Sequence, residues 1–271
     1  MAIVTISRGS ATGGLLLAEG LSKTLGYHLV SREEIVRGIA KFGVVESNLE
    51  RFMSGPPTFS EDFKHELRCY LSFIQEALCE WAQKDNVVYL GNVGHLLLRG
   101  VSHVLRIRLI APAELRIRML VEREEMTREQ AAAYIEKVDG QRRAWTLLLY
   151  GEDWLNPSLY DLTLNLENMN IGSAVEIAAA AVRCREFSAT DQSRKAMDDL
   201  LLATRVRAAF AADPLIASSE IEVQADSASA TVFLKGKLPS SLVRPVIDIA
   251  GTISGVKKVN KNQLESIDPQ A

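Results

Sequence analysis

The first residues of the chain whose types could do chemistry are the small ones at positions 9–14, which read Gly-Ser-Ala-Thr-Gly-Gly. They follow the apolar run Ile3–Ile6 and precede a helical pattern that begins at Leu15. Small residues let backbone N–H groups approach an anion, and the following helix directs the positive end of its dipole toward it. This order predicts a phosphate-binding loop, although it also suits an ordinary connection between a strand and a helix.

The loop lacks the usual end of the P-loop motif. That motif closes with Gly-Lys and then Ser or Thr, because the lysine reaches the β- and γ-phosphates and the hydroxyl binds Mg²⁺. Here Gly13 is followed by Gly14 and Leu15. The sequence therefore keeps the signal for the fold and loses two groups that serve catalysis.

A second group of chemically capable residues lies between Glu114 and Arg143, where many arginines and lysines occur. Phosphoryl transfer needs such cations, because its catalysis consists mostly of positioning and of neutralising charge on the moving phosphoryl oxygens. The alternative is a solvated helix face, since glutamates alternate with the arginines and Asp139 and Arg143 form an i,i+4 pair.

Composition limits the classes of function. The 271 residues suffice for one α/β domain and a small second domain. A formal net charge of −3 gives no broad basic field, so we expect no nucleic acid polymer as a partner. Cys69, Cys79 and Cys184 lack metal-ligand spacing and indicate reduced thiols. With no export signal and no apolar stretch of transmembrane length, we expect a cytoplasmic protein.

Strands and helices alternate through the first two thirds of the chain, which predicts an α/β fold with a P-loop, in which helices flank a parallel sheet. The predicted strands are residues 3–6, 27–30, 86–91, 104–110 and 160–165. Four predicted helices cover residues 15–25, 61–83, 114–124 and 174–183. Two more are predicted from their caps: a short helix that Ser31 caps, and a helix that Thr127 and Gln130 cap and that runs to about Tyr150.

A polar stretch divides the chain into two predicted domains. Residues 1–186 form the first domain, residues 187–196 a linker and residues 197–266 the second domain. The second domain is predicted to be a small α+β module of the order α-β-β-α-β. Its predicted elements are a helix at 197–212, strands at 221–224 and 231–236, a helix at 241–253 and a strand at 256–264.

Several short motifs resemble the cytidylate kinase-like family, over roughly residues 1–183. Those in the later part of the domain are Lys137-Val138-Asp139, Arg142, Gly151-Glu152-Asp153-Trp154, Pro157–Leu162 and Asn165. Those in the earlier part are Thr5–Arg8, Gly13-Gly14, and the strand that ends at Gly91 before Leu96-Leu97. The resemblance implies the fold of P-loop nucleoside monophosphate kinases, ATP as phosphoryl donor, Mg²⁺ and a nucleoside monophosphate acceptor. Members of this family often have Gly-Gly where other P-loops have Gly-Lys.

The resemblance also implies roles for individual residues. The residues expected to bind the donor phosphates are Arg8, Ser10, Gly13 and Gly14. Those expected to stabilise charge during catalysis are Arg116, Lys137 and Arg142, with Asp139 orienting these cations. Those expected to bind the acceptor or support its site are Asn92, Asp153 and Asp161, of which the two aspartates could equally be ordinary hydrogen-bonding residues at the ends of elements. The metal ligands are left undetermined.

Other positions depart from the family. Leu15, Ser31 and Asn92 stand where it often has a polar or charged residue, an acidic residue and an arginine, respectively. Gly140 stands where an arginine can occur, although Arg143 lies nearby. Loss of one charge-stabilising group can cost a factor of about 10²–10³ in rate. The sequence thus leaves open an active kinase, a weak or inactive nucleotide sensor that signals through the second domain, and an interaction scaffold.

The second domain resembles a BON domain. The residues that carry the likeness are Val206, Phe210, Asp213, Pro214, Ile221, Val223, Val232, Leu234, Gly236, Ile249, Gly255, Val256 and Val259. Such domains are linked with binding phospholipid or other surface partners, and the lysines at positions 235, 237, 257, 258 and 261 form a modest basic set. We expect a regulatory module for a protein or phospholipid partner, with the oligomeric state left open.

Overall fold

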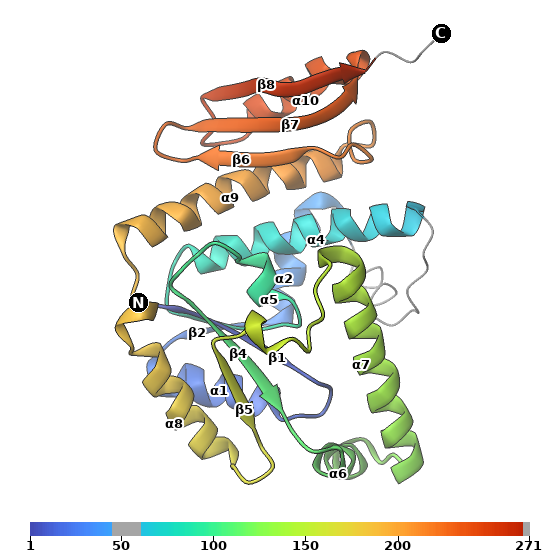
Figure 1. The fold of residues 1–271 in the computed structure, drawn as a ribbon, viewed down its shortest axis with the longest axis vertical. Helices are drawn as coiled ribbons and strands as arrows, with labels where there is room; N and C mark the ends of the chain where they lie inside the picture. Colours follow the sequence, from blue (N-terminus) through green and yellow to red (C-terminus); the bar gives the residue numbers. More distant parts are fainter. Residues whose placement is uncertain (45–60, 268–271) are drawn as a thin grey trace. The chain divides into compact units, whose positions relative to one another are not determined.

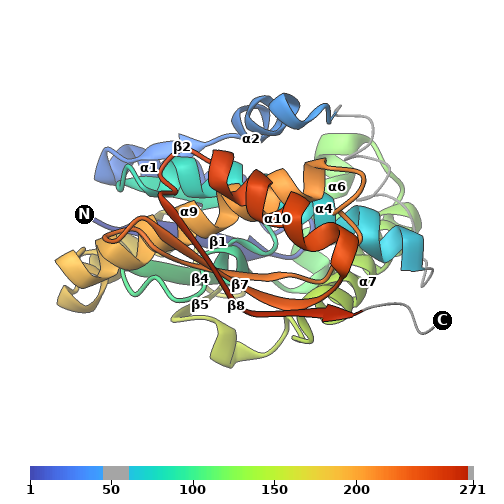
Figure 2. The ribbon, with the colours of Figure 1, turned by 90° about the horizontal axis from the view of Figure 1, so that it is seen from above.

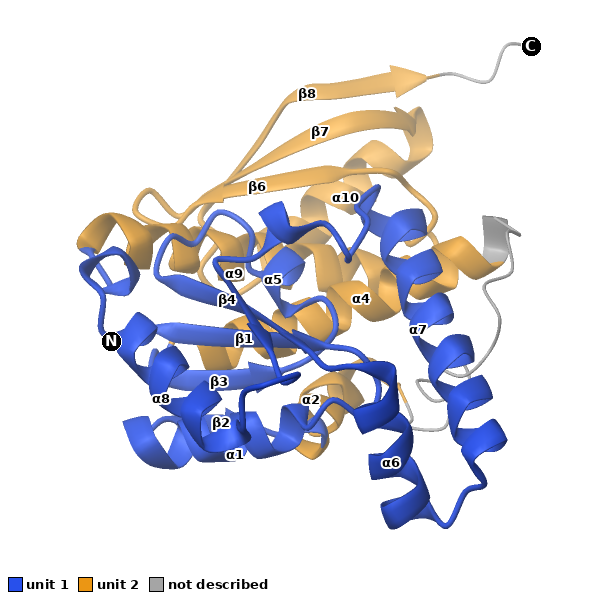
Figure 3. Cartoon of the chain, turned by 60° about the horizontal axis from the view of Figure 1, so that its bottom comes forward, with its two compact units in different colours: residues 1–32, 53–57, 84–190 blue, residues 33–52, 58–83, 191–271 orange. Residues whose placement is uncertain are grey.

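The structure is a computed structural model that describes residues 1–44 and 61–267. These residues form two compact units (Figure 3). Unit 1 contains residues 1–32 and 84–190, and unit 2 contains residues 33–44, 61–83 and 191–267. Unit 2 is therefore built from separate stretches of the chain. No helix in the described residues is long and apolar enough to cross a membrane.

Unit 1 is built on a parallel sheet of β1 (Ile3–Arg8), β2 (His28–Val30), β3 (Val87–Leu90), β4 (Val104–Ile110) and β5 (Leu162–Asn165). The strand order is β2-β3-β1-β4-β5, and all four neighbouring pairs are parallel. Figure 3 shows β2, β3, β1 and β4 in this order, and Figure 1 shows β5 beside β4. β1 is central and almost wholly buried, as its apolar sequence predicts. The predicted fold class is confirmed, and the carboxyl end of β1 leads directly into the small-residue loop.

The helices of unit 1 are α1 (Gly14–Leu25), α5 (Gly94–Leu97), α6 (Ala113–Glu124), α7 (Arg128–Tyr150) and α8 (Ile171–Val182), with short 3₁₀ turns at Pro157–Leu159 and Arg185–Phe187. α1 and α8 pack side by side over one face of the sheet, and their apolar residues form its main core. The predicted capping box of Thr127 and Gln130 begins α7. α8 begins three residues before the predicted position, because the Asn170 side chain caps it by accepting from the Ser173 N–H.

Unit 2 combines α2 (Arg32–Ile39), a 3₁₀ turn (Ala40–Phe42) and α4 (Glu61–Ala82) with all the elements after residue 190. Those elements are α9 (Asp191–Ala212), β6 (Glu222–Asp226), β7 (Thr231–Pro239), α10 (Ser240–Thr252) and β8 (Lys258–Ile267). β7 pairs antiparallel with β6 and parallel with β8. α9 and α10 share one apolar core with the sheet, along which α10 lies in Figure 2.

Within β7, buried Val232 and Leu234 alternate with exposed Phe233 and Lys235. One face of this sheet is therefore covered by helices, and the predicted α-β-β-α-β order is confirmed. α9 begins at Asp191, so the last six residues of the predicted linker are helical.

Candidate functional site

The loop between β1 and α1 takes a shape that requires glycine at position 13. Gly13 has a φ of 79°, in the left-handed region, and a β-carbon there would lie 3.2 Å from Cδ1 of Ile171. The Thr12 hydroxyl donates to the Gly9 carbonyl oxygen at 3.0 Å, which closes the turn. The loop consequently ends at the N-terminus of α1, where free backbone N–H groups attract anions.

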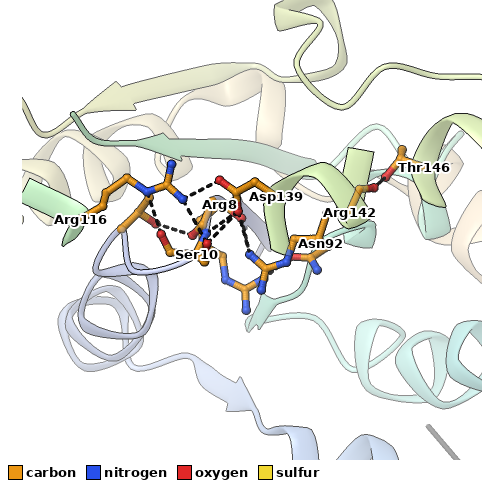
Figure 4. A network of polar contacts seen from close by, with 9 residues as sticks. Arg8, Ser10, Asn92, Arg116, Asp139, Arg142 and Thr146 are labelled. Atoms are coloured by element: carbon orange, nitrogen blue, oxygen red, sulfur yellow. Dashed lines mark hydrogen bonds and ion pairs between the residues drawn. The ribbon is translucent and has the colours of Figure 1, made fainter. Parts of the chain in front are cut away.

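Asp139 of α7 joins the loop from a distant part of the sequence. Its Oδ1 accepts hydrogen bonds from the backbone N–H and the hydroxyl of Ser10, each at 2.9 Å (Figure 4). Arg116 of α6 donates from Nε to the Ser10 carbonyl oxygen at 2.8 Å and from Nη2 to the Asp139 carboxylate. Ser10, Arg116 and Asp139 thus form a closed set of hydrogen bonds beside the loop.

Arg142, one turn after Asp139 on α7, is the second arginine of this set. Its Nη1 donates to the carbonyl oxygen of Arg8 at 3.3 Å and lies 3.7 Å from Oδ1 of Asp139. Burial lowers the pKa of Arg142, while the charge of Asp139 opposes that shift. Since α6 and α7 pack against each other, Arg116 and Arg142 reach the same loop from two helices.

Arg8, the last residue of β1, supplies a third guanidinium. Its Nη1 donates to the side-chain oxygen of Asn92, which follows β3. Burial and the nearby charge of Arg142 lower the pKa of Arg8 to about 10, so the side chain stays charged at neutral pH. We call Arg8, Ser10, Asn92, Arg116, Asp139 and Arg142 the loop network (Figure 4). It brings three guanidiniums and one carboxylate to the loop, and the excess of positive charge suits an anionic ligand.

Three residues predicted for the site lie outside both the loop and the loop network. Lys137 is exposed on α7. Asp153 accepts from Nε and Nη2 of Arg143 at 3.1 and 2.6 Å. Asp161 accepts from Nε and Nη2 of Arg106 at 3.0 and 2.6 Å, at the amino end of β5. Ligands of open parallel sheets bind beyond the carboxyl ends of the strands, so Asp161 lies toward the other end of its strand.

Sequence reasoning missed Arg108 of β4. A pocket of about 330 Å³ beside the loop is lined by Gly9, Arg108, Arg116, Asp139, Arg143 and Trp154, among others. The Arg108 guanidinium lies 5.7 Å from the ring centroids of both Trp154 and Tyr160, and its Nη1 donates to the Leu155 carbonyl oxygen at 2.6 Å. The signal that could have found Arg108 is its position near the carboxyl end of β4. This strand pairs with β1, and Arg108 lies opposite Ser7.

The described residues offer no ready protein cage for a divalent cation. They contain no cluster of three or more His, Cys, Asp or Glu side chains that could hold a metal ion. Leu15, at the position of the usual P-loop hydroxyl, is 47% exposed and carries no ligand atom. Asp139 is the carboxylate of the loop network, and its oxygens already accept from Ser10 and Arg116.

Comparison with known proteins links this geometry to a family. Residues 3–168 match the model of the cytidylate kinase-like family, and residues 198–267 match that of the BON domain. The cytidylate kinase of Thermococcus kodakarensis is 25% identical over 181 residues, which cover 66% of this chain and 87% of that protein. The cytidylate kinase of Pyrococcus abyssi is 27% identical over 183 residues, which cover 66% of this chain and 93% of that protein.

A solved structure supports the fold. An uncharacterized protein from Eubacterium ventriosum aligns with a TM-score of 0.51 and 16% identity, over 67% of this chain and 97% of its own. At this identity the likeness concerns the fold alone.

Proposed function

Because the chain belongs to the cytidylate kinase-like family, we propose that it transfers the γ-phosphoryl group of ATP to a nucleoside monophosphate. The observation that carries the proposal is the loop network, in which Arg116 and Arg142 reach the loop at the N-terminus of α1. Phosphoryl transfer depends on such convergent cations, since charge spreads over the oxygens of the moving group.

The loop and the loop network divide the work in this proposal. The backbone of Gly13 and Gly14 and the dipole of α1 hold the donor phosphates, while Arg116 and Arg142 stabilise the charge that develops. Asp139 holds both arginines and Ser10 in place. ATP, when bound, supplies the γ-phosphoryl group. The bond from the γ-phosphorus to the β,γ-bridging oxygen breaks, a bond from that phosphorus to an oxygen of the acceptor's phosphate forms, and ADP leaves. Mg²⁺ fits here only as a companion of the nucleotide phosphates, so we assign it no protein ligand.

The other predicted residues receive more remote roles. Asp153 and Asp161 already bind Arg143 and Arg106, so we propose that they support the acceptor site rather than contact the acceptor. Asn92 remains a proposed acceptor ligand through its amide nitrogen, because its side-chain oxygen accepts from Arg8. Lys137 remains a proposed charge stabiliser at the exposed surface of α7.

The test is transfer from labelled ATP to a panel of nucleoside monophosphates in the presence of Mg²⁺. Transfer to one acceptor should fall by a factor of about 10² or more in Arg142→Ala. Arg118→Ala, which removes an exposed arginine from α6, is the matched control and should leave the rate unchanged. Absence of transfer to every acceptor, or an equal loss in both variants, would contradict the proposal.

A second candidate is a weak or inactive nucleotide sensor. Asn92 favours it, since a neutral amide engaged by Arg8 stands where the resembling family often has an arginine. A nucleotide-dependent rise in the unfolding temperature without any transfer would support this candidate over the kinase.

For the BON domain we propose a protein partner rather than an anionic membrane. Lys235 lies 3.0 Å from Glu222, and Lys237 lies 3.1 Å from Glu265. Two of the five lysines are therefore balanced by neighbouring glutamates, which weakens attraction to anionic headgroups. Sedimentation of the intact protein with vesicles rich in phosphatidylserine tests this: the protein should stay in the supernatant.

A further inference from the structure

Gly14 stands where the usual P-loop motif has its lysine. The space that a side chain at position 14 would need is already occupied by another residue. A β-carbon on Gly14 would lie 2.8 Å from Cγ and 3.2 Å from Cδ of Arg8. The closer distance is too short for a real contact between two carbon atoms. The aliphatic stem of Arg8 therefore passes over the α-carbon of Gly14, at the first residue of α1.

The charge of Arg8 is poorly compensated by the protein. Among the described residues no carboxylate lies within ion-pair distance of its guanidinium, whose side-chain partner is the neutral amide of Asn92. The nearby Arg142 adds a like charge that outweighs the opposing charge of Asp139. Placing a partly buried cation without a counter-ion costs free energy, and an anionic ligand removes that cost. The phosphate-binding loop is the adjoining element, so the expected anion is a phosphate.

We propose that Arg8 takes the place of the missing P-loop lysine and binds the terminal phosphates of the nucleotide, an inference that rests on the proposed nucleotide site. A lysine would reach those phosphates from position 14, whereas Arg8 reaches over position 14 from the end of β1. Glycine at 14 is then required because any side chain would obstruct Arg8. Asn92 holds the guanidinium without neutralising it, which leaves its charge available to the ligand.

The first test is binding of a non-hydrolysable ATP analogue by isothermal titration calorimetry. Arg8→Met keeps the apolar stem and should weaken binding at least about tenfold, whereas the exposed control Arg118→Met should not change it. Arg8→Lys keeps the charge and should retain most of the affinity. It also serves as the second variant if Arg8→Met fails to fold.

The second test exchanges the two positions. Gly14→Lys alone should weaken binding at least about tenfold, because the new side chain meets the stem of Arg8 and adds a like charge. Combining it with Arg8→Ala opens the space and should restore affinity to within about threefold of the original protein. This non-additive rescue is not expected if Arg8 serves only to hold Asn92.

The outcomes separate the two proposals. If the original protein does not bind the analogue, the proposed nucleotide site is wrong. If it binds and Arg8→Met binds equally well, or if the double variant is no better than Arg8→Ala alone, the site stands and the role of Arg8 is overturned.

Discussion

At the scale of single residues, Asn92 determines how available the charge of Arg8 is. Its amide oxygen accepts from Nη1 of Arg8 and carries no charge. Asn92→Asp would place a carboxylate against the same guanidinium, raise the pKa of Arg8 and form an ion pair that competes with a phosphate. We expect affinity for the ATP analogue to fall at least about tenfold, while the unfolding temperature stays the same or rises.

Calorimetry and thermal unfolding together check this prediction. A matched control is Asn260→Asp in β8, which makes the same change of charge in unit 2 and should leave the affinity unchanged. Unchanged affinity in Asn92→Asp would show that the charge of Arg8 does not serve the ligand.

A second residue, His95 of α5, should make stability depend on pH. It is 3% exposed, its Nδ1 lies 3.0 Å from the Ser7 hydroxyl, and its ring contacts Tyr160 at a centroid distance of 4.7 Å. Burial, and then the charges of nearby arginines, lower its pKa to about 4. His95 is therefore packed inside unit 1, where water does not stabilise a charged imidazole.

The sign of this effect follows from proton binding. The unfolded chain binds a proton at His95 near pH 6.5, while the folded chain does so only near pH 4, so acid favours unfolding between these values. Stability linked to His95 should therefore be lost as the pH falls through this window, by about 2–3 kcal/mol. Urea unfolding at pH 7 and pH 4.5 should show a smaller loss in His95→Phe than in the original protein. The exposed His28→Gln should behave as the original does.

The sequence predicts part of this site and misses the rest for identifiable reasons. Asp139 and Arg142 lie three positions apart on one helix, so a pattern shared with a family can place both at the loop. Lys137 belongs to the same pattern, but residues two apart on a helix point in different directions, and it is exposed. Arg108 is missed because the sequence of β4 resembles an ordinary apolar strand. Arg108 lies beside the loop only because β4 pairs with β1, and the sequence alone does not show this pairing.

At the scale of elements, substituting alanine for either of two helical glycines should change the free energy of unfolding in opposite directions. A β-carbon on Gly20 of α1 would lie 2.7 Å from Cγ2 of Val175 on α8, whereas one on Gly140 of α7 meets nothing within 4 Å. Alanine favours a helix over glycine by about 1 kcal/mol at either position. Gly140→Ala should therefore raise the free energy of unfolding by about that amount. Gly20→Ala should lower it by about 1–2 kcal/mol, because the stiff valine cannot move aside.

Chemical denaturation of both variants measures these changes. Because the gain in helix propensity is common to the two, their difference reports the packing of α1 against α8. Equal effects would show that these helices are not tightly packed at Gly20.

The elements also show where sequence patterns stop being informative. The start of α7 is predicted correctly, because a capping box is a local signal that Thr127 and Gln130 form by themselves. The start of α9 is misplaced, since the polar residues after Asp191 resemble a linker. Polar residues do not end a helix when other positions on it are buried, as Ser193 and Met197 are.

At the scale of the whole molecule, chain order does not predict how the described residues group. α4 lies between β2 and β3 in the sequence, yet it belongs with α9 and the C-terminal sheet in unit 2. Gln83 donates to Asp198 at 2.7 Å, and Glu80 lies 3.8 Å from Arg205. A division of the sequence into consecutive domains cannot show this, because each contact joins residues more than 100 positions apart.

This arrangement predicts that the C-terminal module cannot be removed without cost. Truncation after Thr190 would deprive α4 of α9 and expose Cys79, which is 0% exposed in the intact protein. Losing the burial of several apolar side chains costs several kcal/mol, so the unfolding temperature should fall by about 10 °C or more. A module attached only as a tail would leave that temperature unchanged.

Thiol labelling gives this prediction a local readout. Burial raises the pKa of Cys79 to about 12, so in the intact chain its thiol should not react at pH 8, whereas the exposed Cys184 should react at once. Truncation should make Cys79 reactive and leave the rate at Cys184 unchanged, so that Cys184 serves as the internal control. Cys79 that stays protected in the truncated chain would show that α4 is covered without α9. The buried thiol of Cys79 thus reports directly whether α4 and α9 depend on each other for their fold, although residues 84–190 of unit 1 separate them in the sequence.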